Sequence, residues 1–304
     1  MKLLVTAALG ADQGQLDELR ALGHDVVYVA DEQAPLPEGA SEAEGIVCNA
    51  LFLHHDQAQF ANLTLVQLTS AGLDRAPVAD LEARGVTVFN ARGVYSVPIA
   101  EWVVMQVLQI AKHASFFHHN QAARKWEKQR DLTELAGRTA CIVGFGDVGQ
   151  EVAKRLRAFG VRIIGVRQHP APSALADEVV GPEGLDEALA SADFVVLTVP
   201  LTPSTHHLLN ERRLAMLKDD AMLVNVARGA VIDEEALVAA LEAGRFAGVA
   251  LDVFEREPLD ADSPLWGFDR CLVTPHNSFV SDRNARRLFA AVLTNLTSRR
   301  SVWE

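Results

Sequence analysis

The sequence predicts an α/β protein built from two parallel sheets, each covered by helices. The chain has 304 residues, which is too long for one ordinary core and fits two domains of roughly 100 to 200 residues each. Hydrophobic residues make up 49% and charged residues 22%, the balance of a packed globular protein. Short apolar runs alternate with helix-like stretches, and this alternation is typical of parallel sheets with helices on both faces.

A first series of apolar runs predicts the strands of one domain. These runs are bounded by turn residues and cover residues 2–9, 25–30, 45–50, 64–69 and 86–90. Residues 98–137 follow, with Pro98 at the start of a long apolar helix and a polar arm behind it. We expect this segment to lead from the first domain into the second.

A second series of apolar runs predicts six more strands. They cover residues 139–144, 161–167, 193–199, 221–226, 248–253 and 271–274. Residues 281–298 then place apolar side chains at helical spacing, at Leu288, Phe289, Val292 and Leu296, with no further strand to follow. We therefore expect the last helix to return to the first domain, which gives a substrate domain of residues 1–95 and 281–304 and a second domain of residues 96–280.

Composition excludes several classes of partner. A net charge of -12 without a Lys/Arg-rich block argues against nucleic acid, which needs a concentrated basic face. The most apolar helix, residues 98–111, is interrupted by polar side chains and is shorter than the ~20 residues that a membrane span needs. Three cysteines in apolar runs, at Cys48, Cys141 and Cys271, indicate free buried thiols in a reducing compartment, so we expect a soluble cytoplasmic protein.

We predict no metal site. Histidines occur as adjacent pairs, at His54 and His55, His118 and His119, and His206 and His207. Adjacent side chains point apart on a helix or strand, and no cysteine or carboxylate set completes a ligand group.

The clearest local motif is a strand that runs into G-x-G-x-x-G and then into a helix, at residues 141–159. Gly144 permits a tight turn, Gly146 lets the backbone approach a pyrophosphate, and Gly149 lets the helix pack on the strand. The helix N-terminus offers amide donors near Asp147 and Val148 and a positive dipole. The context predicts a Rossmann domain that binds a dinucleotide.

Arg167 bears on the choice of dinucleotide. About 20 residues beyond the glycine loop, an NAD site usually has an acidic residue that accepts from the ribose 2′-hydroxyl. This sequence has Arg167 followed by Gln168, and a guanidinium can grip a 2′-phosphate in bidentate fashion. We therefore predict NADP(H) over NAD(H); the alternative is a solvent-facing arginine at a strand end.

Three further segments place charged residues at predicted strand ends, where ligands sit in open α/β sheets. They are residues 225–229 with Arg228, residues 251–258 with Glu257, and residues 274–277 with His276. A carboxylate substrate needs a bidentate cation, a carbonyl under reduction needs a proton, and the proton donor needs a carboxylate that keeps it charged. These residue types suit the reduction of a 2-oxo acid.

With these motifs in order, the chain resembles the D-isomer-specific 2-hydroxyacid dehydrogenase family, which includes glyoxylate/hydroxypyruvate reductases and phosphoglycerate dehydrogenases. The resemblance covers most of the chain and rests on Ser-Ala-Gly-Leu-Asp at 70–74, Ala-Glu at 100–101, the glycine loop, Val-Pro-Leu-Thr-Pro at 199–203, Val-Asn-Val-Ala-Arg-Gly at 224–229, Asp-Val-Phe at 252–254 before Glu257-Pro258, and Thr-Pro-His at 274–276. It implies a Rossmann domain plus a flavodoxin-like substrate domain.

The resemblance also implies roles. His276 is the acid/base, Glu257 pairs with it and keeps it protonated, and Arg228 binds the substrate carboxylate and carbonyl. Backbone amides near Ala71 and Gly72 hold the substrate carboxylate. Pro200, Val226 and Ala227 line the cofactor, and Asp252 accepts a hydrogen bond from the nicotinamide carboxamide. Glu255, the rival acid, is interpreted as surface charge.

The expected function is NADP(H)-dependent interconversion of a small 2-oxo acid and its D-2-hydroxy acid by a homodimer, with residues 102–126 at the interface. An NAD-linked D-hydroxyacid or phosphoglycerate dehydrogenase is the alternative, and a nicotinamide-sensing, corepressor-like binding protein is a third reading. Bulky Phe279 stands where many relatives have small residues, so it narrows the expected site. Glyoxylate, hydroxypyruvate, pyruvate and branched 2-oxo acids remain open.

Overall fold

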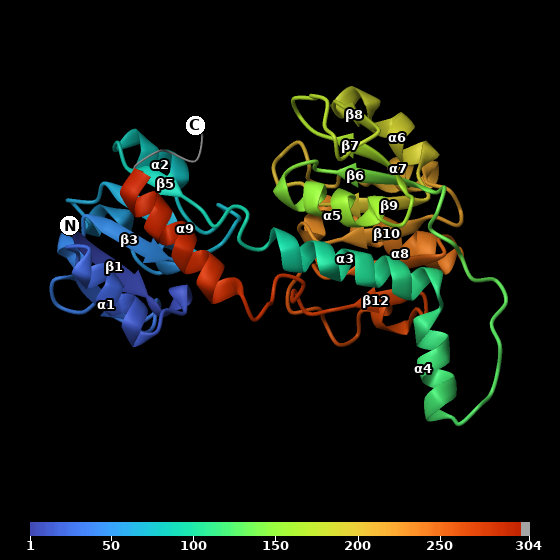
Figure 1. Ribbon diagram of the computed structural model, residues 1–304, viewed down its shortest axis with the longest axis horizontal. Helices are drawn as coiled ribbons and strands as arrows, with labels where there is room; N and C mark the ends of the chain where they lie inside the picture. Colours follow the sequence, from blue (N-terminus) through green and yellow to red (C-terminus); the bar gives the residue numbers. More distant parts are fainter. Residues whose placement is uncertain (299–304) are drawn as a thin grey trace. The chain divides into compact units, whose positions relative to one another are not determined.

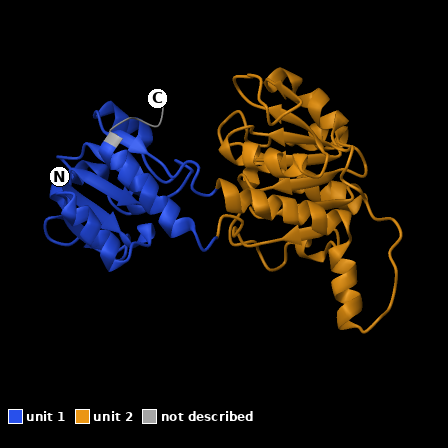
Figure 2. Ribbon diagram, viewed as in Figure 1, with its two compact units in different colours: residues 1–95, 281–304 blue, residues 96–280 orange. Residues whose placement is uncertain are grey.

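The chain divides into two compact units in a computed structural model that describes residues 1–298 (Figure 2). Unit 1 comprises Met1–Tyr95 with Ser281–Glu304, and unit 2 comprises Ser96–Val280. Each unit is an α/β layer structure with its own parallel sheet (Figure 1).

The described part of unit 1 is built on a five-stranded parallel sheet in the order β2-β1-β3-β4-β5. Its strands are β1 (Lys2–Thr6), β2 (Asp25–Val29), β3 (Gly45–Cys48), β4 (Leu65–Leu68) and β5 (Thr87–Phe89). Its helices are α1 (Gln13–Ala21), α2 (Val78–Ala83) and α9 (Asn284–Ser298). This strand order is the flavodoxin-like one, in agreement with the predicted fold class.

Alternation along the strands of unit 1 decides which helix covers which face. Leu3 and Val5 point to the face covered by α1 and α9, and Leu4 points to the face covered by α2. The apolar stripe expected in residues 281–298 packs on the first of these faces. A hydrogen bond of 2.7 Å from Asn295 Nδ2 to Gln67 Oε1 also joins α9 to β4.

The described part of unit 2 has a seven-stranded parallel sheet in the order β12-β11-β10-β9-β6-β7-β8. Its strands are β6 (Thr139–Val143), β7 (Arg162–Val166), β8 (Glu178–Val180), β9 (Phe194–Leu197), β10 (Met222–Asn225), β11 (Gly248–Leu251) and β12 (Cys271–Val273). The first six in chain order have the 3-2-1-4-5-6 arrangement of the Rossmann sheet, and β12 extends it.

The prediction of six strands was wrong by one. The missed strand, β8, is the third of the Rossmann order and lies at the edge of the sheet. It has only three residues, begins with the exposed Glu178 and is never fully buried, so it lacks the apolar run that marks the interior strands. The other strand predictions correspond to observed strands, each of which ends one to three residues earlier than predicted.

Helices cover both faces of the unit 2 sheet. The helices described in this unit are α3 (Ser96–Ala111), α4 (Ala114–Ala122), α5 (Asp147–Arg157), α6 (Leu185–Ser191), α7 (Glu211–Met216) and α8 (Glu234–Glu242), and all of them except α4 pack on the sheet. Helices α3 and α5 share one hydrophobic cluster, and α6, α7 and α8 share the other. Helix α4 extends away from the sheet at the end of α3 (Figure 1). Short 3-10 helices lie at Ala7–Leu9, Ala40–Glu42, Leu51–Leu53, Gln57–Gln59, Pro182–Gly184, Gly229–Val231 and Pro264–Gly267.

Two further expectations concern the cysteines and membrane-spanning helices. Cys48 and Cys141 are fully buried free thiols, and burial raises the pKa of Cys141 to about 12, whereas Cys271 is only partly buried. Among residues 1–298, none of the helices combines the length and apolar character that crossing a membrane requires.

Candidate active site

The glycine loop joins β6 to α5 with backbone contacts that leave no room for side chains. Gly144 has φ +102°, and a β-carbon there would lie 2.6 Å from the carbonyl carbon of Thr198. At Gly149 a β-carbon would lie 2.4 Å from the Gly144 oxygen. Thr198 Oγ1 also donates to the Gly144 carbonyl at 2.6 Å, which ties the loop to the end of β9.

The loop has space where a dinucleotide would need it. A β-carbon on the exposed Gly146 would meet no atom within 4 Å, in contrast to Gly144 and Gly149. Gly146 caps α5, whose first-turn amides around Asp147 and Val148 have no intrahelical acceptor by the geometry of any helix start. Open space, amide donors and the positive end of the dipole fit a pyrophosphate.

Arg167 comes directly after β7, at the same edge of the sheet as the glycine loop. It is half-buried, and its Nε donates to the His169 carbonyl at 2.7 Å. Gln168 is exposed beside it. Along the same strand, Arg162 lies at the opposite end and pairs with Glu178 at 2.9 Å. The arginine that begins β7 and the arginine that follows it therefore have different surroundings: Arg162 is in an ion pair, and Arg167 is anchored by a backbone carbonyl.

Residues after β9 and β10 complete this edge. The Pro200 carbonyl accepts from Thr205 Oγ1 at 2.6 Å. At the end of β10, the buried side chain of Asn225 accepts from Ala227 N–H and donates to the Arg228 carbonyl, both at 3.0 Å. These bonds close a tight turn that contains Val226, the buried Ala227 and the half-buried Arg228. Asn225 was not predicted as a site residue. The sequence feature that could have indicated its role is its position two residues before Ala227, whose N–H its side chain binds.

Glu257 and His276 meet as the sequence predicts. Glu257 Oε2 lies 2.9 Å from His276 Nδ1, while Glu257 Oε1 accepts from Phe254 N–H at 3.1 Å. Each side chain is about one-third exposed, at 37% and 35%. The carboxylate is therefore oriented by its own loop, and because Nδ1 faces it, Nε2 is the ring nitrogen left for a ligand.

Asp252 organises the loop that carries His276. It is fully buried at the end of β11, and its carboxylate accepts from Thr274 Oγ1 at 2.5 Å and from the N–H groups of Asn277 and Ser278, both at 2.8 Å. The Asp252 carbonyl accepts from His276 N–H at 2.8 Å, and His276 itself has φ +49°. These bonds hold the histidine in a left-handed conformation that β-carbons disfavour. A cofactor contact for Asp252 stays a prediction.

Two interpretations of neighbouring residues need correction. His206 and His207 do not point apart: their rings stack with centroids 4.0 Å apart, because His207 has φ +47° and turns to the same side. Glu255 is more than surface charge, since its carboxylate lies 2.8 Å from His207 Nε2 and accepts from Glu234 N–H. Burial, with Glu255 nearby, raises the pKa of Glu234. Within residues 1–298 no group of histidine, cysteine and acidic side chains could hold a metal.

Phe279 packs edge-on to the histidine, with ring centroids 6.1 Å apart and an interplanar angle of 86°. Its side chain is partly exposed. The ring therefore lies beside His276 at the outer surface of the loop, where it can limit access to the imidazole.

In unit 1 the loop after β4 carries Ala71 and Gly72. Asn90 Nδ2 donates to the Ala71 carbonyl at 2.7 Å, and Ser70 Oγ donates to the Gly72 carbonyl at 2.8 Å. Tyr95 OH holds the preceding Thr69 carbonyl at 2.5 Å. The side chains of Asn90, Ser70 and Tyr95 thus hold three carbonyl groups of this loop. Because each peptide group is planar, a held carbonyl also fixes the direction of the N–H in the same peptide.

Sequence reasoning missed one carboxylate at this edge of unit 1. Glu32 follows β2 and accepts from Thr6 Oγ1 at 2.6 Å and from the backbone amides of Asn49 and Ala50. It therefore joins the carboxyl ends of β1, β2 and β3. No spacing in the sequence signals this bond, because the partners are 17 to 26 residues away.

Comparison with known proteins identifies the family. Residues 104–278 match the model of the D-isomer specific 2-hydroxyacid dehydrogenase NAD binding domain. The chain belongs to the D-isomer-specific 2-hydroxyacid dehydrogenase family. With the family comes the reaction class, an NAD(P)-dependent dehydrogenase acting on CH-OH groups.

Relatives in this family cover nearly all of the chain. A hydroxypyruvate reductase of Blautia hydrogenotrophica is 30% identical over 97% of this chain and 96% of its own length. A D-3-phosphoglycerate dehydrogenase of Methanocaldococcus jannaschii is 34% identical over 91% of this chain but only 53% of its own length. A crystal structure of a family member from Xanthobacter autotrophicus Py2, in complex with NADPH and MES, has a TM-score of 0.81 and 31% identity over 97% of this chain and 93% of that one.

Proposed function

We propose that this dehydrogenase interconverts a small 2-oxo acid and its D-2-hydroxy acid with NADP(H), as a glyoxylate/hydroxypyruvate reductase does. The observation that carries the proposal is the 2.9 Å pair between Glu257 and His276 Nδ1, at the same sheet edge as Arg228 and the glycine loop. In this reading unit 2 holds the cofactor and unit 1 is the substrate domain.

The pair supports proton transfer. The Glu257 carboxylate accepts from His276 Nδ1, which leaves Nε2 as the ring nitrogen that can donate a proton to the substrate. A bound reduced nicotinamide would supply a hydride to C2 of the substrate. His276 Nε2 would donate a proton to the carbonyl oxygen, so that the 2-oxo acid, NADPH and one proton would give the D-2-hydroxy acid and NADP⁺. His276 is reprotonated from water.

Arg228 supplies the cation for the substrate. Its guanidinium donates through Nη1 to the Ala227 carbonyl at 2.8 Å, which fixes the side chain on its own turn. A guanidinium binds a carboxylate in bidentate fashion and polarises an adjacent carbonyl. In unit 1, the anchored loop at Ala71 and Gly72 offers backbone amides that can bind a carboxylate.

The cofactor contacts would come from residues at the carboxyl edge of unit 2. Gly144, Gly146 and Gly149 with the α5 amides would hold the pyrophosphate, and Pro200, Val226, Ala227 and Asp252 would line the nicotinamide half. Arg167 and Gln168 would bind the 2′-phosphate, since an obligate cation stands where NAD-specific sites have a carboxylate. This supports NADP(H), while the family's description names NAD and keeps an NAD-linked enzyme as the alternative.

The test is a matrix of initial rates. Glyoxylate, hydroxypyruvate and a branched 2-oxo acid are each measured with NADPH and NADH, for wild type, Arg167→Asp and the matched control Arg162→Ala at the other end of β7. We expect wild type to prefer NADPH, Arg167→Asp to reverse the preference through a rise in the KM for NADPH, and Arg162→Ala to behave as wild type.

The outcomes separate the readings. A wild type that prefers NADH would refute the assignment of Arg167 and favour the NAD-linked alternative. A protein that binds NADPH but reduces none of the three acids would favour the sensing protein instead.

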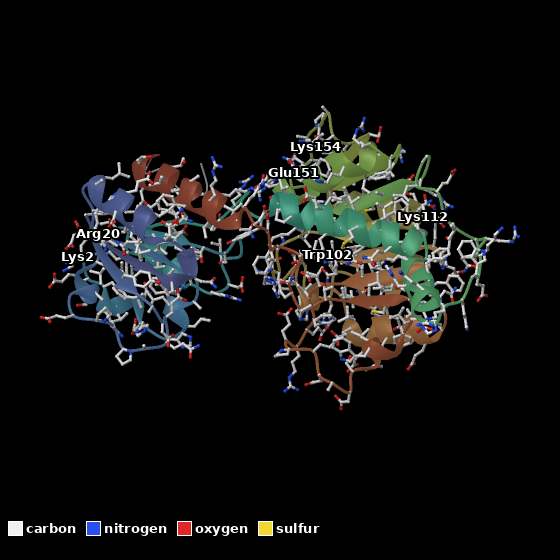
Figure 3. All side chains as sticks on the ribbon, turned by 60° about the horizontal axis from the view of Figure 1, so that its bottom comes forward. Lys2, Arg20, Trp102, Lys112, Glu151 and Lys154 are labelled. Carbon is white, nitrogen blue, oxygen red and sulfur yellow. The ribbon has the colours of Figure 1, made fainter. Side chains whose placement is uncertain are left out.

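We also propose a homodimer that uses α4 and the arm behind it. Phe116 and Phe117 pack edge to face on α4 with centroids 5.3 Å apart, and the Trp126 side chain is 98% exposed. Trp102 lies in α3, and Lys112 directly follows the end of α3 on the way to this arm (Figure 3). An indole with almost no contact in its own chain supports burial against a second copy.

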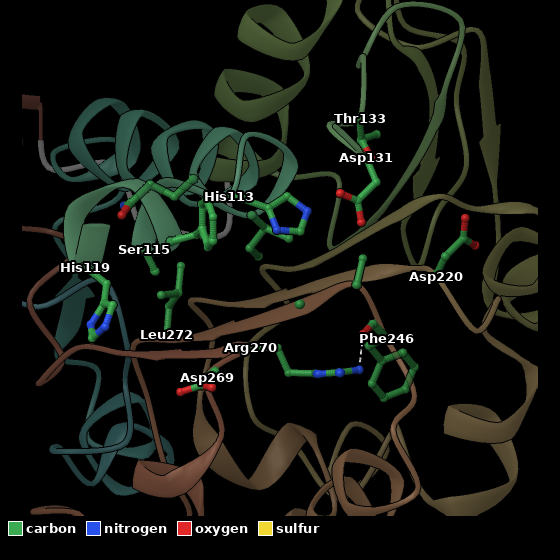
Figure 4. Close-up of a pocket in the computed structure, with 15 residues that line it drawn as sticks. His113, Ser115, His119, Asp131, Thr133, Asp220, Phe246, Asp269, Arg270 and Leu272 are labelled. Atoms are coloured by element: carbon green, nitrogen blue, oxygen red, sulfur yellow. Dashed lines mark hydrogen bonds between the residues drawn. The ribbon is translucent and has the colours of Figure 1, made fainter. Parts of the chain in front are cut away.

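A cavity beside the arm supports the same interface. Its volume is about 860 Å³, and Figure 4 shows His113, Ser115 and His119 on one side of it and Asp269, Arg270 and Leu272 at the start of β12 on the other. We expect a dimer in light scattering after gel filtration, and monomers for the double variant Phe117→Ser with Trp126→Ser. A monomeric wild type would refute the homodimer.

The buried thiols support a reducing compartment such as the cytoplasm.

A further inference from the structure

The loop with Arg228 and the loop with Glu257 touch through their backbones. Gly229, directly after Arg228, is buried, and a β-carbon built on it would lie 1.8 Å from the carbonyl carbon of Phe254 and 2.2 Å from the amide nitrogen of Glu255. Real side-chain carbons keep 3.4 Å or more from such atoms in ordinary contact. Only glycine therefore allows the two loops to approach this closely.

Phe254, whose carbonyl group Gly229 approaches, also orients the carboxylate of the catalytic pair. Its N–H, in the preceding Val253–Phe254 peptide, donates to Glu257 Oε1 at 3.1 Å, and Glu257 Oε2 faces His276 Nδ1 at 2.9 Å. A shift of Phe254 would therefore move Glu257, and with it the imidazole. On the other side of the contact, Arg228 directly precedes Gly229 in the chain.

Both loops are held on their outer sides, so the contact has little freedom. Asn225 clamps the turn before Gly229 by its two side-chain bonds of 3.0 Å. The Ala230 carbonyl accepts from His207 N–H at 2.8 Å. His207 Nε2 in turn lies 2.8 Å from the Glu255 carboxylate, which also accepts from Glu234 N–H. An added methyl group would be opposed from both directions.

We propose that Gly229 is a positioning residue for the reaction: its contact with the Phe254–Glu255 peptide sets the distance between the Arg228 guanidinium and the Glu257–His276 pair. The inference rests on the proposed function, because it concerns the residues assigned there. Alanine at this position would force the loops apart by on the order of 1.5 Å, since packed interiors do not absorb such overlap. A misplacement of about 1 Å in a reacting group can cost 10²-fold in rate.

A matched control exists on the strand that leads to Phe254. Gly248 begins β11, and a β-carbon there would lie 2.6 Å from Ile110 Cγ2, a side-chain atom of α3. Gly248→Ala therefore adds the same methyl group, also with an overlap, but far along the strand from the Phe254–Glu255 peptide. A third variant, Asn225→Ala, loosens the Arg228 turn without adding an atom.

The experiment compares wild type, Gly229→Ala, Gly248→Ala and Asn225→Ala. For each we measure the circular dichroism spectrum, the Kd for NADPH by fluorescence titration, and kcat and KM for the best of the three 2-oxo acids between pH 5 and pH 9. We expect Gly229→Ala to bind NADPH within about threefold of wild type while kcat/KM falls at least about 100-fold, chiefly in kcat. Its pH profile should also differ from that of wild type, because Glu257 would be displaced from His276 Nδ1.

Each outcome of this experiment supports or overturns the inference about Gly229. A loss in Gly229→Ala that disappears when rates are divided by bound cofactor, with unchanged KM and pH profile, would show a merely structural role and overturn the inference. Equal kinetics for Gly229→Ala and Gly248→Ala would do the same. If Gly229→Ala does not fold, Asn225→Ala decides: we expect a fall of about tenfold or more in kcat/KM with NADPH binding kept, and wild-type kinetics would refute the proposal. An inactive wild type would instead overturn the proposed function itself.

Discussion

The carboxyl edges of the two parallel sheets present different chemistry. In unit 2, three loops after β10, β11 and β12 present the charged side chains Arg228, Glu257 and His276. In unit 1, the loop after β4 presents backbone, while Asn90 and Ser70 hold its carbonyls from behind. The same architecture thus offers titratable side chains at one edge and oriented amides at the other. Sequence motifs reveal the first kind of site more readily than the second.

The largest effect should come from the side-chain edge. His276→Ala removes the proton donor, and we expect kcat for 2-oxo acid reduction to fall by about 10²–10⁴-fold, with the Kd for NADPH nearly unchanged. Steady-state rates and a fluorescence titration measure the two quantities. His54→Ala, which removes an exposed histidine of unit 1, is the control and should keep wild-type kcat. A His276→Ala enzyme with half of the wild-type rate would abolish the distinction between the two edges.

The next effect concerns the support beneath that edge. Asp252→Ala leaves three donors of the His276 loop without their acceptor, so we expect a loss of about 3 kcal/mol in the free energy of unfolding. Thermal unfolding followed by calorimetry measures it as a lower Tm. Asp262→Ala, at an exposed loop position, should change the stability by less than about 0.5 kcal/mol. Equal Tm values for both variants would mean that the buried carboxylate does not hold the loop.

A smaller effect is expected at the backbone edge of unit 1. Asn90→Ala removes one neutral hydrogen bond to the Ala71 carbonyl, worth about 1 kcal/mol, so the amides of the loop lose orientation. We expect KM for the 2-oxo acid to rise about fivefold to tenfold with kcat little changed. Asn62→Ala, an exposed residue of the same unit, is the control. A fall in kcat with constant KM would assign the loop to the chemical step rather than to binding.

The smallest effect tests charge at the amino end of the unit 2 sheet. Asp193 precedes β9; burial by itself would raise its pKa, but the Thr139 amide, Lys218 and Arg138 bring the pKa below 3.8. Its stabilising contribution is therefore complete well above pH 3.8 and is lost as the pH falls through the lower, folded-state pKa. Asp193→Asn should cost about 1 kcal/mol in urea unfolding at pH 7, less at pH 3, and leave kcat unchanged. A difference that grows on acidification would contradict this sign.

Some features of the molecule follow from its sequence alone. Apolar runs at regular intervals predict two parallel sheets, because a buried strand needs a continuous apolar stretch. The glycine loop and the charged residues Arg228, Glu257 and His276 are identifiable because each lies at a predicted strand end with chemistry suited to a ligand. The contact between Glu257 and His276 Nδ1, at 2.9 Å, is the pairing that the resemblance to the family implies.

Other features were decided only by the tertiary structure. The edge strand β8 has too few buried residues to mark itself, and left-handed backbone at His207 turns its ring onto His206. In the sequence, nothing distinguishes Asp252 from another acidic residue at a strand end. The tertiary structure buries its carboxylate and binds it to the loop that carries His276. Gly229 touches a peptide 25 residues further along the chain. Local patterns specify strands, turns and reactive groups, whereas close contacts between distant backbones depend on how whole elements pack, and no local pattern contains that information.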